Sequence, residues 1–257
     1  MENLKEHALE ITKMAGSYLC DNFKKDASLF SQRGLSKEVT TSYDKECDRI
    51  IKENIVRCFP DHSMLTEESG EEDKGSDYRW IVDSLDGSGN FAAGNPFFSV
   101  SIALMHKDEL ILGVIYAPLL DELYVAEKGK GAYLNGERIR VSKFKNLENS
   151  YIVACEGGSK TNERMSELFA AVYPSVKDMR KLGSAAIECG YVASGRAEAY
   201  ATLSIYPWDI AAGILLVQEA GGQVTDFKGK EWRPEQADVL CTNGNLHDTM
   251  LKRLKDV

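Results

Sequence analysis

The chain has 257 residues, of which 43 % are hydrophobic and 28 % are charged. These values are ordinary for a folded globular protein, and they exclude a disordered chain, a collagen-like fibre and a small disulfide-rich protein. The 31 basic and 40 acidic side chains leave a net charge of −9. The sequence shows no stripe of basic side chains of the kind that binds a phosphate backbone, so nucleic acid is not an expected partner. The excess of carboxylates serves solubility or gathers to hold cations, and only the positions decide between these two explanations.

The cysteines and the first residues indicate a reducing, cytoplasmic compartment. The six cysteines form no CxxC pair, and together with the four histidines they show no zinc-site spacing. The first residues contain no apolar segment typical of a signal peptide. The longest apolar stretches are shorter than the ~18 residues that a membrane-spanning helix needs. We therefore expect no membrane association.

The beginning of the chain has helical periodicity. Apolar residues recur at helical spacing over residues 4–19 and again over 47–58, which predicts two amphipathic helices. Pro60 ends the second helix. The polar stretch 28–37 between them predicts a loop.

After these helices the period changes to that of strands. Residues 98–104 alternate between large apolar side chains and small ones, the pattern of a strand with two different faces. Strands are also expected at 110–116 and 122–126, and Asn135-Gly136 predicts a tight hairpin turn. The first half is thus predicted as two helices followed by an antiparallel sheet.

The second half alternates between strands and helices. The pattern predicts strands at 151–155, 224 and 239–242, and helices at 162–172, 183–194, 207–220 and the C-terminus. Without a linker or an internal repeat, we expect one compact catalytic unit of the α+β class. It has an N-terminal α+β lobe, residues 1–145, and a C-terminal α/β lobe, residues 146–257.

One segment carries most of the chemical information. A short apolar strand runs into Asp83 and then into Asp86-Gly87-Ser88. Such a strand end can aim both carboxylates and the Leu85 carbonyl at one point, an all-oxygen set that hard divalent cations prefer. A helix beginning at Gly87-Ser88 would add free N–H groups suited to a phosphate. Taken alone, the spacing is more often an Asp turn followed by a serine cap.

Three further segments have ordinary explanations when taken singly. Glu67-Glu68 follows a plausible strand at 63–66 and fits a solvated loop. Asp44 opens the second helix and fits an N-cap. Asp209 lies in the first turn of a very apolar helix, where the helix dipole favours a carboxylate.

Taken together, in this order and at this spacing, these segments resemble the inositol monophosphatase family of lithium-sensitive, magnesium-dependent phosphatases. The matching segments are 40–44, 67–69, 83–91, 183–186, 208–213 and 219–222. They extend over nearly the whole chain. The resemblance implies a layered α-β-α-β-α sandwich of the inositol monophosphatase/fructose-1,6-bisphosphatase type.

The resemblance also implies a set of metal ligands. Glu67, Asp83 and the Leu85 carbonyl would hold a first Mg²⁺, and Asp83, Asp86 and Asp209 a second. A third, more weakly bound ion would be coordinated by Glu67, and Mn²⁺ would be able to replace Mg²⁺.

The same resemblance assigns roles around the phosphate. Ser88 and Asp44 match the pair that orients and deprotonates the attacking water, and the amides of Gly87 and Ser88 match a phosphate cradle. Lys37 matches a basic residue near the metals. The strip along which the alcohol part of the substrate lies would be formed by Gly183, Ser184 and Ala185.

The implied reaction is hydrolysis of a small phosphate monoester by metal-activated water, without a covalent intermediate. Two cations would neutralise the phosphate and stabilise the leaving alkoxide. No Gly-x-Ser-x-Gly elbow appears, which argues against a serine-hydrolase triad. The complete ligand set argues against a catalytically retired binding protein, and the missing DxDxDG loop argues against a structural calcium module.

The expected substrate is inositol monophosphate. The alternatives are fructose 1,6-bisphosphate, alone or in a dual activity, 3′-phosphoadenosine nucleotides and histidinol phosphate. Two positions depart from the family. Ser84 stands where a proline is usual, and we expect this difference to leave the ligands intact. Thr202 stands where animal members carry a glutamate that binds the inositol hydroxyls, so the identity of the substrate stays open. The family usually forms homodimers, so a homodimer is expected.

Overall fold

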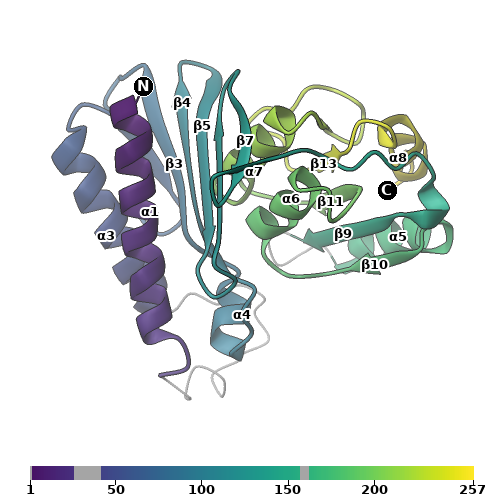
Figure 1. Cartoon of the computed structure of the whole chain (residues 1–257), viewed down its shortest axis with the longest axis horizontal. Helices are drawn as coiled ribbons and strands as arrows, with labels where there is room; N and C mark the ends of the chain where they lie inside the picture. Colours follow the sequence, from purple (N-terminus) through teal and green to yellow (C-terminus); the bar gives the residue numbers. More distant parts are fainter. Residues whose placement is uncertain (1, 26–41, 157–161) are drawn as a thin grey trace.

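The computed structural model describes residues 2–25, 42–156 and 162–257 (Figure 1). The predicted loop at 28–37, together with Lys37 and Thr40, lies outside the described residues. The helices are α1 Glu2–Asn22, α3 Ser42–Cys58, α4 Ser88–Ala93, α5 Asn162–Val172, α6 Ala185–Ala193, α7 Pro207–Glu219 and α8 His247–Leu254. Short 3₁₀ turns lie at Leu147–Asn149 and Tyr173–Ser175.

The strands of the described residues form two sheets. The first has the order β2-β1-β3-β4-β5-β6-β7-β8 and the second the order β10-β9-β11-β13-β12. The first is built from β1 Ser63–Thr66, β2 Gly70–Glu72, β3 Tyr78–Asp86, β4 Ser99–His106, β5 Glu109–Ala117, β6 Glu122–Glu127, β7 Gly131–Leu134 and β8 Glu137–Ile139. The second is built from β9 Tyr151–Glu156, β10 Asp178–Arg180, β11 Ala199–Leu203, β12 Gln223–Thr225 and β13 Val239–Thr242.

The prediction of a purely antiparallel first sheet is wrong at one edge. β1 pairs parallel with β3, with Met64 opposite Trp80. The chain leaves β1 through a hairpin into β2 and then returns over residues 73–77, so that β3 starts at the same end as β1. Parallel neighbours end at the same edge of a sheet. Glu67, which follows β1, and Asp83, near the end of β3, therefore lie at the same end of these two strands.

The layers follow from which side chains each face of a sheet buries. In β4, Val100 and Ile102 pack in the core that α1 and α3 share with the first sheet, whereas Ala103 packs in the core with α6 and α7. The helices α6 and α7 lie between the two sheets, and α5 and α8 cover the outer face of the second sheet (Figure 1). This arrangement confirms the layered α-β-α-β-α sandwich.

Small residues let the middle layer pack closely. A Cβ added to Gly213 of α7 would lie 2.7 Å from the Cys189 sulfur of α6, and one added to Gly113 of β5 would lie 2.8 Å from the Ala212 carbonyl oxygen. Buried cores tolerate no such overlap. The helix α7 belongs to the second half of the chain but packs on β3, β4, β5 and β6 of the first sheet. The boundary at residues 145 and 146 stays a prediction.

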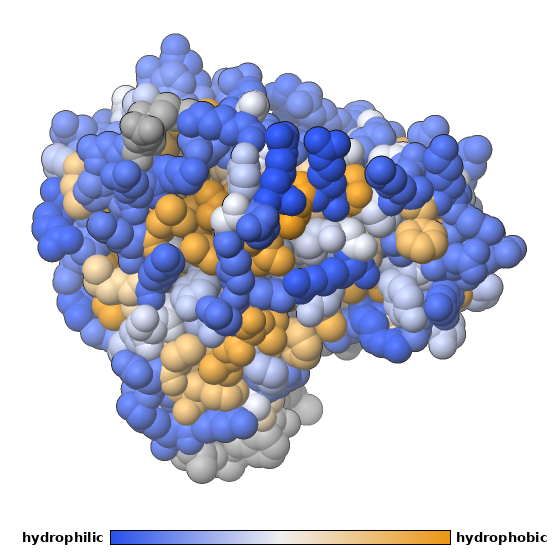
Figure 2. All heavy atoms as spheres, viewed as in Figure 1, coloured by the Kyte–Doolittle hydropathy of each residue, from blue (hydrophilic) through white to orange (hydrophobic). Residues whose placement is uncertain are grey.

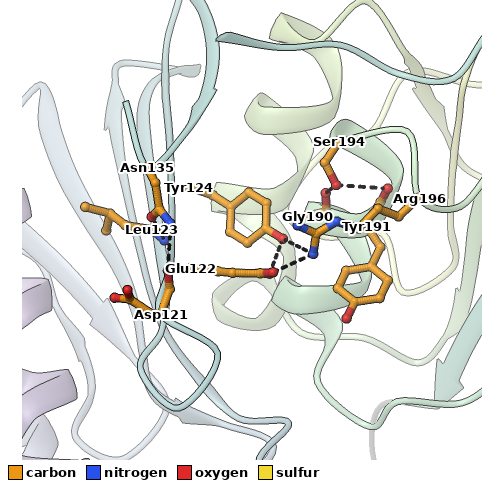
Figure 3. A network of polar contacts seen from close by, with 9 residues as sticks. All are labelled: Asp121, Glu122, Leu123, Tyr124, Asn135, Gly190, Tyr191, Ser194 and Arg196. Carbon is orange, nitrogen blue, oxygen red and sulfur yellow. Dashed lines mark hydrogen bonds and ion pairs between the residues drawn. The ribbon is translucent and has the colours of Figure 1, made fainter. Parts of the chain in front are cut away.

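A polar network also joins the two halves (Figure 3). The buried Tyr124 of β6 donates its hydroxyl to Glu122 at 2.6 Å, and Arg196, just beyond α6, donates to the same carboxylate at 2.6 Å. The Tyr124 ring lies so close to Gly190 of α6 that an added Cβ there would approach its atoms to 2.8 Å. The first sheet and α6 are therefore joined by both packing and charge.

Most sequence-based boundaries agree with the structure, and the differences have local causes. The predicted helix at 183–194 begins only at Ala185, because Gly183 has a left-handed φ of 80° and Ser184 is the N-cap. The hairpin turn at Asn135-Gly136 is confirmed, with φ of 50° and 84°. The strands β2, β10 and β11 were not predicted.

The surface agrees with the composition. On the face shown in Figure 2, hydrophilic side chains cover most of the periphery, and hydrophobic atoms show in patches between them. Among the residues that the structure describes, no helix combines the length and the apolar character needed to cross a membrane.

Candidate active site

Two carboxylates come together at the edge where β1 and β3 end in parallel. The Glu67 amide donates to the Val82 carbonyl at 3.2 Å, which places the end of β1 beside Asp83. The pairing of β3 with β4 shifts register between Asp83 and Asp86, where two residues of β3, Ser84 and Leu85, lie opposite the single residue Val100 of β4. Such a bulge turns side chains away from the regular alternation. Within it, the Leu85 amide donates to the Asp83 carboxylate at 2.9 Å.

The third carboxylate comes from the other half of the chain. Asp209 lies in the first turn of α7 and accepts the Tyr206 amide at 3.1 Å, which orients its side chain at the helix start. In the described residues, Glu67, Asp83 and Asp209 each offer an oxygen, and these three oxygens lie within 4.8 Å of one another. The structure thus brings together three of the ligands expected from the sequence, one from the residue that follows β1, one from β3 and one from α7.

The electrostatics of this cluster call for a counterion. Burial, followed by the charges of Glu67, Asp86 and Asp209, raises the pKa of Asp83 well above its usual range. Burial, followed by Asp86 and Glu67, does the same to the pKa of Asp209. Partial desolvation, together with neighbouring carboxylates, raises the pKa of the solvent-exposed Glu67 to about 7. Gathering these groups therefore costs free energy unless protons or cations neutralise them.

A divalent cation fits this donor set. All three side chains offer oxygen, and the described residues of the cluster include no histidine or cysteine. Hard cations such as Mg²⁺ select carboxylate and carbonyl oxygens, whereas softer ions favour imidazole and thiolate. The cluster of Glu67, Asp83 and Asp209 is therefore able to bind a metal ion of the hard class.

Asp86 has a different environment. Its buried carboxylate accepts the Ala185 amide at 3.0 Å, the Ala186 amide at 2.9 Å, the Ser99 hydroxyl at 3.1 Å and the Ser184 hydroxyl. Four donors surround it, mostly from the first turn of α6. Asp86 also contributes its charge to the raised pKa values of Asp83 and Asp209, so it borders the cluster. Asp86 thus connects the cluster to α6.

The turn after Asp86 brings the two halves into contact. Gly87 has a left-handed φ of 87°, and α4 begins at Ser88, as the sequence predicts. A Cβ on Gly87 would lie 2.8 Å from the Phe97 carbonyl oxygen and 3.1 Å from that of Gly183. Only glycine fits here. The predicted cradle at Gly87 and Ser88 therefore lies against the predicted substrate strip that starts at Gly183.

Asn90 holds this contact in place. Its side-chain amide donates to the Phe97 carbonyl at 2.6 Å, to the Leu182 carbonyl at 2.8 Å and to the Gly183 carbonyl at 3.2 Å. From the opposite side, the buried Glu188 of α6 accepts the Leu182 amide at 2.6 Å and the Gly183 amide at 3.2 Å. The 182–183 segment is thus bound through its carbonyls and its amides.

Sequence reasoning assigned no role to Glu188 or Ser99. The signal for Glu188 is a lone carboxylate inside an otherwise apolar helix segment, and the signal for Ser99 is a hydroxyl in a fully buried strand. A buried polar group needs a partner. By that rule both residues are expected to hydrogen-bond to neighbouring groups, and both do so at the site, Ser99 with Asp86 and Glu188 with the 182–183 segment.

The remaining predicted residues have the following places. Asp44 lies buried in the first turn of α3, and Ser88 is half-buried at the start of α4. Thr202 lies in β11 with no exposed surface, its hydroxyl 4.0 Å from the Cys155 sulfur. Its role as a substrate contact stays a prediction, as do the roles of Asp44 and Ser88. Lys37 lies outside the described residues.

Known proteins resemble this chain over nearly its whole length. Residues 1–257 match the inositol monophosphatase family. A Thermotoga maritima protein named fructose-1,6-bisphosphatase/inositol-1-monophosphatase is 41% identical over 222 residues, which cover 86% of this chain and 84% of that protein. The Nus factor SuhB of Escherichia coli K12 is 35% identical over 254 residues, which cover 97% of this chain and 94% of that protein. The solved structure of a Thermotoga maritima IMPase is 36% identical with a TM-score of 0.90 and covers 100% of this chain and 98% of that one.

The family match and the layered sandwich assign the chain to the phosphatases, and its carboxylate cluster could hold the metal on which that class depends. Within that class, the chain belongs to the inositol monophosphatase family. The Thermotoga maritima relative is named as a fructose-1,6-bisphosphatase/inositol-1-monophosphatase, whereas the Escherichia coli relative is named as a Nus factor.

Proposed function

We propose that this chain is a Mg²⁺-dependent phosphatase that hydrolyses inositol monophosphate by direct attack of water. The observation that carries the proposal is the oxygen cluster of Glu67, Asp83 and Asp209, whose members come from three separate elements and crowd within 4.8 Å of one another. Such crowding of like charges is stabilised by cations and has no evident structural purpose without them.

The residues divide the work as follows. Glu67, Asp83, the Leu85 carbonyl, Asp86 and Asp209 would hold the metal ions. When bound, the ions supply charge neutralisation of the phosphate, a lower pKa for coordinated water and stabilisation of the leaving alkoxide.

The other groups of the site act on the water and on the phosphate. The Ser88 hydroxyl orients the water, and an Asp44 carboxylate oxygen accepts its proton. The first amides of α4 lack intrahelical acceptors and donate to the phosphate oxygens. The oxygen of the water forms the new bond to phosphorus while the bond from phosphorus to the alcohol oxygen breaks, so no protein side chain becomes phosphorylated.

The relatives also support a broader substrate range. The Thermotoga maritima relative is named for both a fructose-1,6-bisphosphatase and an inositol-1-monophosphatase. Thr202 is short, neutral and without exposed surface, so this position lacks the carboxylate that would bind a polyol more selectively. We therefore propose that inositol 1-phosphate is the preferred substrate and that fructose 1,6-bisphosphate is hydrolysed as well. We also propose that the chain acts as a homodimer, as the resemblance to the family implies.

The test is a substrate panel under controlled metal. The purified chain, freed of metal with EDTA and then supplied with Mg²⁺, is assayed for phosphate release from four esters: inositol 1-phosphate, fructose 1,6-bisphosphate, 3′-phosphoadenosine 5′-phosphate and histidinol phosphate. We expect the highest kcat/KM for inositol 1-phosphate and no activity without metal. A preference for one of the last two esters would overturn the substrate assignment, and undiminished hydrolysis in EDTA would overturn the mechanism.

A further inference from the structure

Ser84 lies between two expected metal ligands and outside the regular pairing of its sheet. The ladder between β3 and β4 is interrupted from Asp83 to Asp86, and β1 pairs with β3 only as far as Val82. Ser84 is nevertheless 1 % exposed. Its polar groups therefore need partners from another element, because a buried polar group without a hydrogen bond costs free energy.

One turn of α3 supplies both partners. The Ser84 hydroxyl donates to the Asp44 backbone carbonyl at 3.0 Å. In return, the Ser84 carbonyl accepts the Cys47 thiol at 3.2 Å. Asp44 and Cys47 are three residues apart and hence lie on one face of the helix. The bulge of β3 and the first turn of α3 are thus joined by two hydrogen bonds of opposite direction.

The thiol keeps its role as donor. Cys47 has no exposed surface, and burial, followed by the charge of Asp44, raises the pKa of its thiol. The Cys47 sulfur also lies 3.9 Å from the Ala15 carbonyl oxygen of α1. The neutral thiol therefore remains available to donate, and the contact extends from β3 through α3 towards α1.

We propose that Ser84 is a positioning residue, which holds the backbone of Asp44 at a fixed distance from the bulge that carries Asp83 and Leu85. The inference rests on the proposed function, in which Asp44 accepts the proton of the attacking water. Alanine at position 84 would remove the donor to Asp44, and proline would do the same while also fixing φ. A threonine would keep the hydroxyl. The consequence is that Ser84 affects turnover through Asp44, without touching the substrate.

The matched control for this proposal is Ser150. Its hydroxyl is also buried and also donates to a backbone carbonyl, that of Asn146 at 2.8 Å, but Ser150 lies immediately before β9 of the second sheet. Ser150→Ala removes the same chemical group at a similar cost in stability and at a distance from the cluster. It separates loss of a hydrogen bond from loss of positioning.

The experiment measures kcat, KM and the Mg²⁺ activation constant for Ser84→Ala, Ser84→Thr and Ser150→Ala with p-nitrophenyl phosphate and with inositol 1-phosphate. We expect Ser84→Ala to lower kcat by about tenfold, with KM and the activation constant close to those of the parent. Ser84→Thr should recover most of the loss, and Ser150→Ala should leave kcat unchanged. Equal kcat in Ser84→Ala and the parent, or an equal loss in Ser150→Ala, would overturn the proposal.

A double-mutant cycle tests the route through Asp44. Asp44→Asn keeps the backbone carbonyl but removes the proton acceptor, so adding Ser84→Ala to it should lower kcat no further. Full additivity of the two losses would show that Ser84 acts elsewhere and would overturn the proposal.

Hydrogen exchange gives a readout that needs no activity. We expect amides of residues 42–58 to exchange faster in Ser84→Ala than in the parent, with no change there in Ser150→Ala. Unchanged exchange in Ser84→Ala would overturn the contact itself. If the parent hydrolyses no phosphate ester with Mg²⁺, the proposed function fails, and this exchange result still decides whether Ser84 holds α3.

Discussion

Two regions of this molecule hold carboxyl groups with raised pKa values, and they do so in opposite ways. In the cluster of Glu67, Asp83 and Asp209, several carboxyl groups crowd together and raise one another's pKa values beyond the effect of burial. In the middle layer, Glu188 is fully buried among apolar side chains, and burial raises its pKa to about 8. The Leu182 and Gly183 amides point at Glu188 and partly offset the shift.

The difference indicates how the negative charge of each region is neutralised, by a bound proton or by a metal cation. A single buried carboxyl group becomes neutral by keeping one proton, and it then serves as a hydrogen-bond partner. A crowded set of oxygens that includes the exposed Glu67 is neutralised better by a multivalent cation. The cluster is therefore expected to respond to metal, whereas Glu188 is expected to respond to pH.

Metal removal should have the largest effect, and only on the cluster. Treatment with EDTA should abolish phosphate release, and Mg²⁺ should restore it and raise the melting temperature, because a ligand that binds the folded state stabilises it. Glu188→Gln should show the same rise with Mg²⁺. A melting temperature that is the same with and without Mg²⁺ in the parent would contradict the assignment of the cluster.

Asp209→Asn should have the next largest effect. We expect kcat to fall by roughly a hundredfold or more, since a charged ligand is lost from the site, while stability without metal stays equal or rises because repulsion is relieved. The measurement is kcat beside melting temperature in EDTA.

Glu219→Gln is the matched control, because Glu219 ends the same helix and accepts the Gly129 amide at 2.7 Å and the Gly131 amide at 2.8 Å. Its kcat should match that of the parent. A near-normal kcat in Asp209→Asn would remove Asp209 from the set of ligands.

Glu188→Gln should change the pH dependence of stability. The folded protein holds a proton on Glu188 up to a pKa of about 8, whereas the unfolded carboxyl group ionises near 4.5. The folded state therefore binds more protons between these values, and this contribution to the free energy of unfolding is present at low pH and falls as pH rises. The slope from this one group is at most about 1.4 kcal/mol per pH unit.

Urea unfolding of the parent and Glu188→Gln near pH 5 and near pH 8 tests this expectation. The stability of the variant relative to the parent should increase with pH, because glutamine has no proton to lose. A difference that stays constant over this range would mean that Glu188 is ionised in the folded protein at all of these pH values.

Thr202→Glu should have the smallest effect, on the choice of substrate. The threonine hydroxyl has no exposed surface, but a glutamate is two bonds longer and carries a charge that accepts hydrogen bonds from a polyol. We expect the ratio of kcat/KM for inositol 1-phosphate to that for fructose 1,6-bisphosphate to rise by about tenfold. Thr202→Gln controls for length without charge, and an unchanged ratio in Thr202→Glu would contradict a role for this position.

Periodicity predicted the outer helices well and the central strand of the second sheet not at all. α1 and α3 each have one buried and one solvated face, so their apolar residues recur at helical spacing. In contrast, all five residues of β11 are buried, because helices cover both faces of its sheet. A strand without a polar face shows no alternation and cannot be recognised by it.

The candidate site shows the same division. The strand that ends in Asp83 and Asp86 suggested an all-oxygen cation site, and the resemblance to the family added Glu67 and Asp209 as ligands and the phosphatase activity. The contacts of Ser84 with α3 and of Asn90 with residues 182 and 183 were not predicted, because the partners lie 37 to 93 residues away. The partners of Glu188 lie only 5 and 6 residues away, and its one signal was a lone carboxylate in an apolar helix segment.

The sequence by itself determined which chemical groups are available for the proposed reaction, because the identity of each predicted metal ligand and its place at the end of a strand or helix are local properties. The tertiary structure decided which of these groups meet. The parallel return of β3 beside β1 places Asp83 next to Glu67, and the packing of α7 on the first sheet adds Asp209 from more than 120 residues away. Such long-range contacts are selected by burial of whole faces, and that selection depends on every layer of the sandwich at once.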